Sequence, residues 1–417
     1  MPELPEVETI ARDLRGLVVG SWIVDARSNW PATLRSHAPD AFAAEIAGRQ
    51  IEGVGRRGKQ LLVWLGPRAQ GMAESADSTA SGRAAQPDFR AGSGPAVLTL
   101  HLKMTGQLFV VPAGTPADRH VHVTLALADG REIRFRDMRK FGRIGLYGRD
   151  PATGLPLEGE ARGVLATGAE PLADDFTAPR FAAMLARRRG RLKTLLLNQD
   201  FVAGVGNIYA DEALWRARLH PLRDAHTLRP REARRLHGTL REVLAEAVER
   251  RGSSVDDYTA PEGDGSMQEH LAVYQRAGEP CPRCGRVIRR IVLGGRSTHF
   301  CGWCQRLAAG ERQAAASLLS PEKWSGRPPR GSRWTELGGE GSLGRTKAEE
   351  AEIRRVSAKR AAEARATERK RRVAASRAAA ATRRAAARGG AASAATVPAA
   401  TVSGAEATVA VRGGGAG

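Results

Sequence analysis

Long apolar runs are missing from this sequence of 417 residues. A membrane-spanning helix needs about 20 consecutive apolar residues, and no stretch approaches that length. The first residues are acidic and show neither the basic start nor the apolar core of a secretory signal. We therefore expect a cytoplasmic protein with no membrane partner, and we expect it to act as a monomer.

Cysteine is scarce, and all four cysteines fall between positions 281 and 304. A secreted disulfide scaffold would spread its cysteines along the chain. Here they form two C-x-x-C pairs, Cys281 with Cys284 and Cys301 with Cys304. Four thiolates at this spacing are typical of one closed, tetrahedral zinc site, which is structural because no position is left open for water. Free thiols or a redox pair are the alternatives.

Acidic residues are outnumbered by basic ones, 45 against 65, which leaves a net charge of +20. Such an excess indicates a polyanionic partner, nucleic acid first and an anionic membrane second. From residue 321 onward there are 20 Lys and Arg and 9 Asp and Glu, or +11, so the rest of the chain carries +9. The body is therefore basic by itself, although a solvated basic surface without a partner is the alternative.

Large apolar residues almost disappear after residue 308. Residues 309–417 are rich in Ala, Arg, Lys and Gly, and they cannot bury a core, so we predict a disordered basic tail in which residues 346–389 can form transient helix. Residues 67–96 are rich in Ala, Gly and Ser. They predict a flexible insertion between two strands.

The remaining segments predict a multidomain α+β protein. Apolar residues at helical spacing over residues 5–17 predict a helix with Val7, Ile10, Leu14 and Leu17 on one buried face. The pattern of residues 22–150 predicts strands, with a hairpin turn at Asp129-Gly130, which indicates a β-sandwich.

The next part of the chain predicts helices over residues 180–188, 191–198, 208–217 and 231–251. A polar loop to about residue 268 follows them. The predicted domains are 1–155, 173–268, 269–308 and the tail 309–417.

The first three residues carry potential chemistry. If Met1 is removed, Pro2 begins the chain and its nitrogen is a secondary amine, which can act as a nucleophile. Glu3 could move protons. The positive end of the following helix disfavours protonation of the amine and keeps it reactive. The alternative is that Pro and acidic residues only begin a helix.

Two further motifs suit anions. Gly204-Val205-Gly206 precedes Asn207 at a predicted helix start, where backbone N–H groups are free to bind an anion; alternatively Asn207 is a helix cap. Between the cysteine pairs, apolar runs flank Gly294-Gly295, which predicts a hairpin with Arg296 near its tip. A basic tip suits a phosphate, although Arg296 could equally be an ordinary exposed side chain.

Three motifs in this order resemble one family. They are Met-Pro-Glu-Leu-Pro-Glu-Val-Glu-Thr at the start, Gly-Val-Gly-Asn-Ile-Tyr-Ala-Asp-Glu in the middle, and a late four-cysteine hairpin with Gly-Arg-Ser-Thr. Over residues 2–308 the chain resembles the formamidopyrimidine-DNA glycosylases, bacterial base-excision repair enzymes for oxidised purines. The resemblance implies an N-terminal catalytic helix, a β-sandwich, a helix–two-turn–helix domain and damaged double-stranded DNA as partner. It also implies a location at the bacterial nucleoid.

The resemblance implies a mechanism. Pro2 would attack C1′ of the damaged nucleotide and form an iminium, while Glu3 would act as general acid and base in expelling the base. Successive β- and δ-elimination would then cut the strand. Lys59 and Arg296 complete the catalytic set, and Glu6 would help to organise it.

The resemblance also implies DNA contacts. Asn207 and Arg296 would hold the phosphates beside the lesion, with Lys193 as a further phosphate contact. Because a damaged base is extruded from the duplex before the chemistry, apolar side chains fill the void. The remaining implied DNA contacts are the void-filling Met104, Arg139 and Phe141, together with His120 and Tyr209. Ser253, Ser254 and the loop to residue 268 would close over the extruded base.

Two rival functions remain open. An endonuclease VIII-like enzyme would have a similar architecture and prefer oxidised pyrimidines, but Leu4 favours the purine branch. A DNA-binding protein without catalysis is the other rival. The sequence departs from the family at Lys103 and Gln275, which stand where glycine is usual, and Lys103 could alter the preference for the opposite base.

Overall fold

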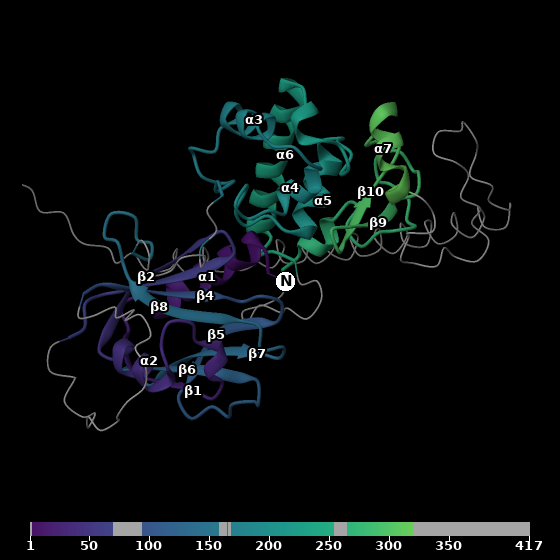
Figure 1. Cartoon of the computed structure of the whole chain (residues 1–417). Helices are drawn as coiled ribbons and strands as arrows, with labels where there is room; N and C mark the ends of the chain where they lie inside the picture. The colour runs from purple at the N-terminus through teal and green to yellow at the C-terminus, as the bar shows by residue number, and fades with distance from the viewer. Residues whose placement is uncertain (1, 70–93, 158–164, 166–167, 254–264, 320–417) are drawn as a thin grey trace, which may run out of the picture. The chain divides into compact units, whose positions relative to one another are not determined.

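The computed structural model describes residues 2–69, 94–157, 165, 168–253 and 265–319 (Figure 1). Most of the predicted insertion at 67–96, of the polar loop up to residue 268 and of the tail therefore lies outside the described residues, and so does Ser254. None of the helices in these ranges is long and apolar enough to cross a membrane.

The N-terminal domain is a β-sandwich, as predicted. Its strands form one antiparallel sheet in the order β5-β7-β6-β1-β2-β3-β4-β8, and both halves of the sheet contribute side chains to the same apolar core. Figure 1 shows the two halves as separate layers. The elements are α1 (Leu4–Val18), β1 (Trp22–Ser28), α2 (Pro39–Ile46), β2 (Arg49–Arg57), β3 (Gln60–Leu65), β4 (Ala96–His101), β5 (Gly106–Pro112), β6 (Val121–Leu127), β7 (Arg131–Asp137) and β8 (Arg143–Gly148), with a short 3-10 helix at Pro31–Thr33.

The predicted hairpin is formed by β6 and β7. Leu125 pairs with Ile133, and Gly130 has a φ of 81°, the left-handed value that glycine adopts without strain in such turns. Alternating residues of β6 are buried in the core, as expected for a strand with one face covered.

Helix α1 packs its apolar face on the same core. Val7, Ile10 and Leu14 are buried as predicted, but Leu17 is 38% exposed. The prediction for Leu17 was wrong because Val18 is the buried residue of the last turn. Helix α2 was not predicted. It is short, and it is anchored by buried Phe42 and Ile46 within a region that otherwise reads as strands.

The second domain is helical. Leu236, Leu240, Val243 and Leu244 form the buried face of its longest helix, which Pro230 opens as predicted. The elements are α3 (Ala178–Ala186), α4 (Leu192–Leu196), α5 (Asn207–Arg216) and α6 (Pro230–Glu249), with 3-10 turns at Ala225–Thr227 and Met267–His270.

The cysteine-rich segment contains a hairpin of β9 (Arg289–Leu293) and β10 (Arg296–Phe300). Gly294 and Gly295 both have positive φ, the pattern of a two-residue turn that matches the strand twist.

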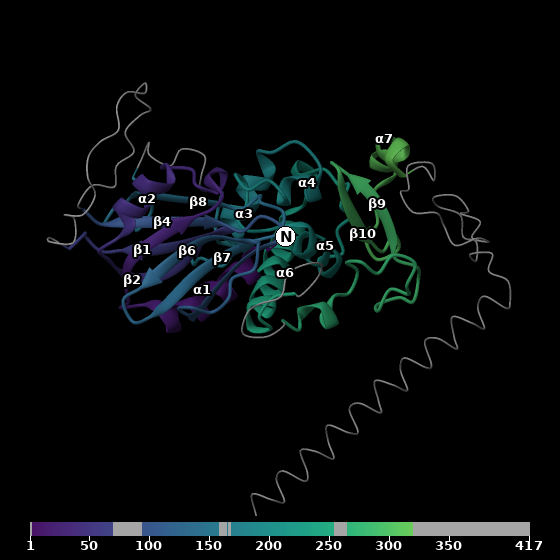
Figure 2. The same ribbon diagram turned by 90° about the horizontal axis from the view of Figure 1, so that it is seen from below.

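The tail begins later than we predicted. Residues Ala309–Leu319 form helix α7, which packs on β9 (Figure 2). Leu307 and Ala315 are buried in a small apolar cluster with Leu222, Leu293 and Phe300. Alanine-rich sequence has high helix propensity, and here the hairpin supplies the apolar surface that the composition alone did not reveal.

Helix α7 should stabilise the hairpin. A chain that ends after Ala308 exposes part of the cluster around Leu293 and Phe300, whereas a chain that ends after Leu319 keeps it covered. We expect the shorter chain to lose about 1–3 kcal/mol of local stability, measured by hydrogen exchange of the β9 and β10 amides. Equal exchange in the two chains would show that α7 contributes nothing to the hairpin.

Candidate active site

The carboxylate of Glu3 lies at the N-terminus of helix α5. It accepts hydrogen bonds from the backbone N–H of Ile208 at 2.9 Å and of Tyr209 at 3.5 Å, and it is almost completely buried. The anion site predicted at Gly204-Val205-Gly206 therefore exists, but these two N–H groups bind a carboxylate of the protein itself. The residue next to the candidate nucleophile Pro2 is thus fixed to a helix whose contacting residue, Ile208, is 205 positions away in sequence.

The two glycines of this motif make room for the N-terminal segment. A Cβ at Gly206 would lie 2.3 Å from Cδ of Glu3, and a Cβ at Gly204 would lie 2.7 Å from Cβ of Leu4. The N–H of Leu4 donates to the carbonyl oxygen of Gly204 at 3.0 Å. The motif is glycine-rich because the start of the chain packs directly on its backbone.

Glu6 joins three segments in the same buried region. Its carboxylate accepts from the N–H of Glu3 at 2.8 Å, from the hydroxyl of Tyr209 at 2.5 Å and from the N–H of Ser253 at 2.8 Å. Ser253 is the first residue of the segment that was predicted to close over the extruded base. Glu6 therefore connects helix α1, helix α5 and the start of that segment, in agreement with its expected organising role.

Tyr209 does not present its side chain for a direct DNA contact in this structure. It is fully buried, and its hydroxyl is engaged by Glu6. Burial, followed by the negative charge of Glu6, raises the pKa of Tyr209 well above its usual value, so the phenol stays protonated as a donor. Its predicted role as a DNA contact is better replaced by a role in holding Glu6.

Glu3 and Lys59 influence each other electrostatically. Burial raises the pKa of Glu3, while the positive charge of Lys59 opposes the rise. Burial lowers the pKa of Lys59, and Glu3 opposes this fall while Arg296 adds to it. Glu3 therefore holds a proton at higher pH than an exposed glutamate would, as a general acid requires.

Lys59 lies in the turn between β2 and β3, and a residue that is distant in sequence binds this turn. The carboxylate of Glu170 accepts from the N–H of Gly58 and pairs with Arg56 at 2.8 Å. Arg56 also pairs with Glu8 of α1 at 2.9 Å. Sequence reasoning missed Glu170, because it is more than 100 residues away from Lys59 and belongs to no motif.

Lys193 is not available for the phosphate contact that we predicted. Its side chain is fully buried, with its ammonium 2.7 Å from Oδ1 of Asp211 and 2.7 Å from the carbonyl oxygen of Ser297. The other oxygen of Asp211 accepts from the N–H of His299 at 2.8 Å. This pair ties helices α4 and α5 to strand β10.

Asn207 and Arg296 are the first residues of α5 and β10, two of the elements that the ion pair of Lys193 and Asp211 connects. Arg296 is exposed. Oδ1 of Asn207 has no hydrogen-bond partner among the described residues. The predicted phosphate contacts thus stand on a shared, rigid support, and they remain predictions.

Met104 and Phe141 are exposed by 40% and 46%, although large apolar side chains are usually buried. They lie in the turns between β4 and β5 and between β7 and β8. The guanidinium of Arg139 stacks over the ring of Phe141, 5.0 Å from its centre. His120 is partly buried and accepts from Nε of Arg119. The exposure of Met104 and Phe141 fits void filling, which no contact in the structure tests.

The two departures from the family pattern have one backbone explanation. Lys103 and Gln275 both have a φ of 57°, in the left-handed region that glycine adopts without a steric penalty. Glycine is thus the residue that both turns favour. Lys103 and Gln275 occupy this conformation at a cost of about 1–2 kcal/mol each.

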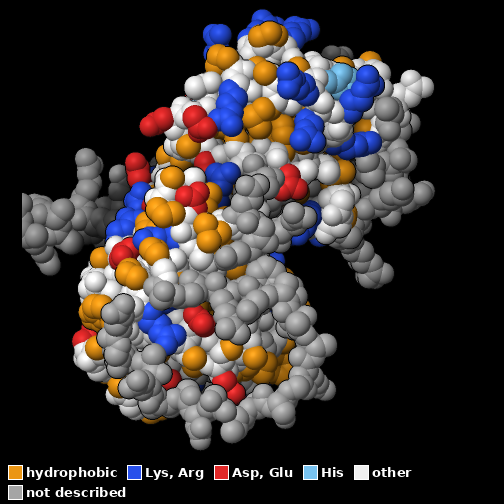
Figure 3. Space-filling model, turned by 60° about the vertical axis from the view of Figure 1, so that its left-hand side comes forward, with side chains coloured by type: hydrophobic (Ala, Val, Ile, Leu, Met, Phe, Trp, Pro, Cys, Tyr) orange, Lys and Arg blue, Asp and Glu red, His pale blue; other side chains and the backbone are white. Residues whose placement is uncertain are grey.

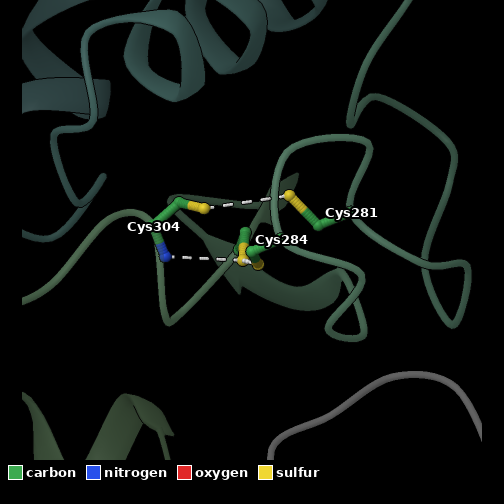
Figure 4. A group of neighbouring side chains, drawn as sticks. Cys281, Cys284 and Cys304 are labelled. Atoms are coloured by element: carbon green, nitrogen blue, oxygen red, sulfur yellow. Dashed lines mark hydrogen bonds between the residues drawn. The ribbon is translucent and has the colours of Figure 1, made fainter.

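The four cysteines form one metal site. Their sulfur atoms all lie within 4.8 Å of one another, with 3.9 Å between Cys281 and Cys304 and 3.5 Å between Cys284 and Cys301. In a tetrahedron with Zn–S bonds of about 2.3 Å the sulfur atoms are about 3.8 Å apart, so the residues fit zinc. Figure 4 shows Cys281, Cys284 and Cys304 converging. The indole N–H of Trp215 donates to Sγ of Cys281 at 3.4 Å, a contact that supports the ligand.

Basic side chains gather on the helical part of the surface. Figure 3 shows Lys and Arg over the region of this face formed by the helices, with few Asp and Glu among them. A positive surface of this kind attracts a phosphate backbone.

Three protein-family models match the chain in the order of these structural parts. The Formamidopyrimidine-DNA glycosylase N-terminal domain matches residues 1–144, the Formamidopyrimidine-DNA glycosylase H2TH domain matches residues 167–259, and the zinc finger found in FPG and IleRS matches residues 278–307. Together with the buried Glu3 beside Pro2, they define a DNA glycosylase with one structural zinc.

Individual proteins are similar over the same range. Relatives named formamidopyrimidine-DNA glycosylase, from Herpetosiphon aurantiacus and Chloroflexus aurantiacus, are 44% and 45% identical over 73% of this chain and 100% and 98% of their own length. The crystal structure of the MutM (FPG) protein from Thermus thermophilus is 42% identical with a TM-score of 0.58, and 74% of this chain covers all of it. A Lactococcus lactis FPG mutant in complex with DNA containing Fapy-dG is 33% identical, with a TM-score of 0.61 over 73% of this chain and 100% of that one. The chain belongs to the formamidopyrimidine-DNA glycosylase family.

The contact between Gly206 and Glu3 predicts a selective effect of a methyl group. We expect Gly206→Ala to displace the Glu3 carboxylate and to cost about 1–3 kcal/mol of stability in denaturant unfolding. Gly16→Ala is the matched control, because nothing lies within 4 Å of a Cβ there. Gly16 is inside α1, so its replacement should be neutral or add about 0.5–1 kcal/mol. Equal stability of the two variants would refute the packing argument.

The metal site predicts one zinc per chain. Cys301→Ser should lose the metal, measured by elemental analysis, and the amides of β9 and β10 should exchange faster because the hairpin loses its support. Trp303→Phe changes an exposed residue between two ligands and should keep one zinc. Full zinc occupancy of the Cys301 variant would contradict the four-thiolate site.

Proposed function

We propose that this chain excises oxidised purines, 8-oxoguanine and formamidopyrimidines, from double-stranded DNA in base excision repair, and then cuts the strand as an AP lyase. The observation that carries the proposal is the buried carboxylate of Glu3, fixed at the positive end of α5 directly after Pro2. The similarity to FPG structures in complex with damaged DNA supports it. We further propose that the enzyme acts as a monomer in the bacterial cytoplasm, at the nucleoid.

The chemistry begins at the nitrogen of Pro2 once Met1 is removed. The amine attacks C1′ of the extruded nucleotide, and the bond from C1′ to the base breaks. The bond from C1′ to O4′ breaks as well, which opens the sugar. The departing base and O4′ each take up one proton, one from the nitrogen of Pro2 and the other from Glu3, whose raised pKa favours the protonated form. The product is an iminium between Pro2 and C1′.

The iminium carries a positive charge at any pH because its nitrogen was a secondary amine. It withdraws electrons and makes the protons on C2′ acidic. Glu3, now a carboxylate, can accept one of them, and the 3′ phosphate then leaves by β-elimination. A δ-elimination releases the 5′ phosphate in the same manner, and hydrolysis of the iminium frees Pro2. Lys59 lies within electrostatic range of both Glu3 and Arg296, and the two cations suit the phosphates.

An endonuclease VIII-like preference for oxidised pyrimidines is the second candidate. Leucine at position 4 favours the purine branch, because the rival branch tends to carry glycine there; in this structure the side chain of Leu4 is completely buried beside Gly204. Excision of 8-oxoguanine should therefore exceed excision of thymine glycol in otherwise identical duplexes. A clear preference for thymine glycol would support the rival.

The identity of the nucleophile predicts a strict requirement for a free N-terminus. A chain with an uncleaved N-terminal tag should fold and bind DNA but form no covalent adduct when borohydride is added to it with damaged DNA. The same chain with the tag at its C-terminus, and with Met1 removed, should be trapped. Trapping of the N-terminally tagged chain would mean that another amine attacks, with Lys59 as the next candidate, and no trapping in either chain would indicate a DNA-binding protein without catalysis.

A further inference from the structure

The carboxylate of Asp137 lies between the two turns that carry the exposed side chains. Asp137 is the last residue of β7, it is completely buried, and it pairs across the sheet with Gly106, the first residue of β5. Residues 102–105 precede β5 and contain Met104, while residues 138–142 follow β7 and contain Arg139 and Phe141. We call these two segments the wedge turns.

Asp137 binds both wedge turns through hydrogen bonds. Its Oδ1 accepts from the hydroxyl of Thr105 at 2.5 Å and from the N–H of Arg139 at 3.2 Å. Its Oδ2 accepts from the N–H of Gly142 at 2.7 Å. Thr105 is the neighbour of Met104, so one carboxylate restrains the backbone at or beside all three exposed residues.

The contact with Gly142 requires that this residue lacks a side chain. A Cβ at Gly142 would lie 2.2 Å from Cζ of Phe135 and 3.1 Å from Oδ2 of Asp137. Asp137 also donates its own N–H to the carbonyl oxygen of His120 at 2.9 Å. The segment with His120 is thereby joined to the same residue.

We propose that Asp137 is a positioning residue for strand insertion, which makes Met104, Arg139 and Phe141 enter the duplex as one rigid unit when the damaged base leaves. The proposal rests on the proposed function. Two separate turns would lose conformational freedom each time they enter the stack, whereas turns fixed to one buried anion have already lost it. Asp137 itself touches no DNA and acts only through the wedge turns.

The substitution Asp137→Asn tests this role. An amide keeps one acceptor oxygen and replaces the other with a donor, so either Gly142 or the pair of Thr105 and Arg139 loses its hydrogen bonds to residue 137, while the N–H of Arg139 still donates to the hydroxyl of Thr105. We expect excision of 8-oxoguanine from duplex DNA under single-turnover conditions to fall about tenfold or more, in line with one lost hydrogen bond to a buried charge. Fluorescence of 2-aminopurine opposite the lesion, which reports disturbance of the stack, should respond more weakly.

A substrate without a stack separates positioning from a general structural defect. A single-stranded oligonucleotide with an abasic site has no void to fill, so borohydride trapping on it should be unchanged in the Asp137 variant. Asp129→Asn is the matched control, because Asp129 is exposed at the other end of the same hairpin and its carboxylate accepts from Arg131 and Ser21, which both lie outside the wedge turns. It should leave both reactions unchanged.

Thr105 supplies a second, milder test. Thr105→Val removes the hydroxyl that Asp137 binds and should lower duplex excision, while Thr105→Ser keeps the hydroxyl and should restore it. Because the two residues share the contact between them, the double variant with Asp137→Asn should lose less than the product of the two single losses.

The outcomes distinguish the two proposals. If the unaltered enzyme is not trapped on abasic DNA, the proposed function fails. If it is trapped and Asp137→Asn keeps normal duplex excision, or loses trapping on the single strand to the same extent as duplex excision, the positioning role fails.

Discussion

The site depends on one interaction, the hydrogen bonding of the Glu3 carboxylate to backbone N–H groups at the N-terminus of helix α5. A buried carboxylate is costly unless hydrogen bonds and positive charge compensate it. Here the N–H groups of Ile208 and Tyr209 and the helix dipole provide this compensation, and Lys59 lies within electrostatic range. Because Glu3 follows Pro2 directly, the helix that binds the carboxylate also determines where the proline nitrogen lies.

This interaction explains why glycine occupies several positions that take no part in the proposed chemistry. Gly204 and Gly206 allow the N-terminal segment to approach the backbone of the loop, and larger residues would push Glu3 out of reach of α5. Gly252 does the same beside Glu6, where a Cβ would lie 2.8 Å from the side chain. The first residues of a chain are usually mobile, whereas here the segment from Pro2 is fixed because Glu3 is bound to α5.

Much of the fold followed from local sequence. The period-two pattern of β6, the Asp129-Gly130 turn and the cysteine spacing each reflect a constraint that acts over a few residues, and each prediction was confirmed. Helix α7 was missed for the opposite reason. Its stability comes from the apolar cluster on the hairpin, which composition does not reveal.

The site was predicted through motifs, and the errors fell where long-range contacts decide. The family resemblance implied that Lys193 contacts a phosphate. Its ammonium is instead bound in the interior by Asp211 and by the carbonyl oxygen of Ser297, which is distant in sequence. The resemblance also implied that Tyr209 contacts DNA, but its hydroxyl donates to Glu6 in the interior. Glu170 has no sequence signal because its partners are a backbone N–H and arginines of another domain.

One physical arrangement recurs in this domain pair, a largely shielded carboxylate that holds the backbone of another loop. Glu6 binds the N–H of Ser253 and Glu170 binds that of Gly58, each across more than 100 residues, and Asp137 binds that of Gly142 in the turn that follows it. Glu212 accepts from three consecutive N–H groups, those of residues 272–274, at 2.8–2.9 Å. A backbone N–H is present at almost every position, so the acid is the only member of such a contact that a sequence can reveal.

The same arrangement suits an enzyme that must bind a polyanion. Backbone N–H groups that bind a carboxylate cannot move toward the DNA without unfolding the loop. Carboxylates are repelled by phosphate, and burial behind backbone donors keeps them apart from it. The loops around Pro2 are thus fixed by carboxyl groups on the inside, while Arg296 and the basic side chains on the surface of the helices are exposed, in line with the phosphate contacts proposed for them.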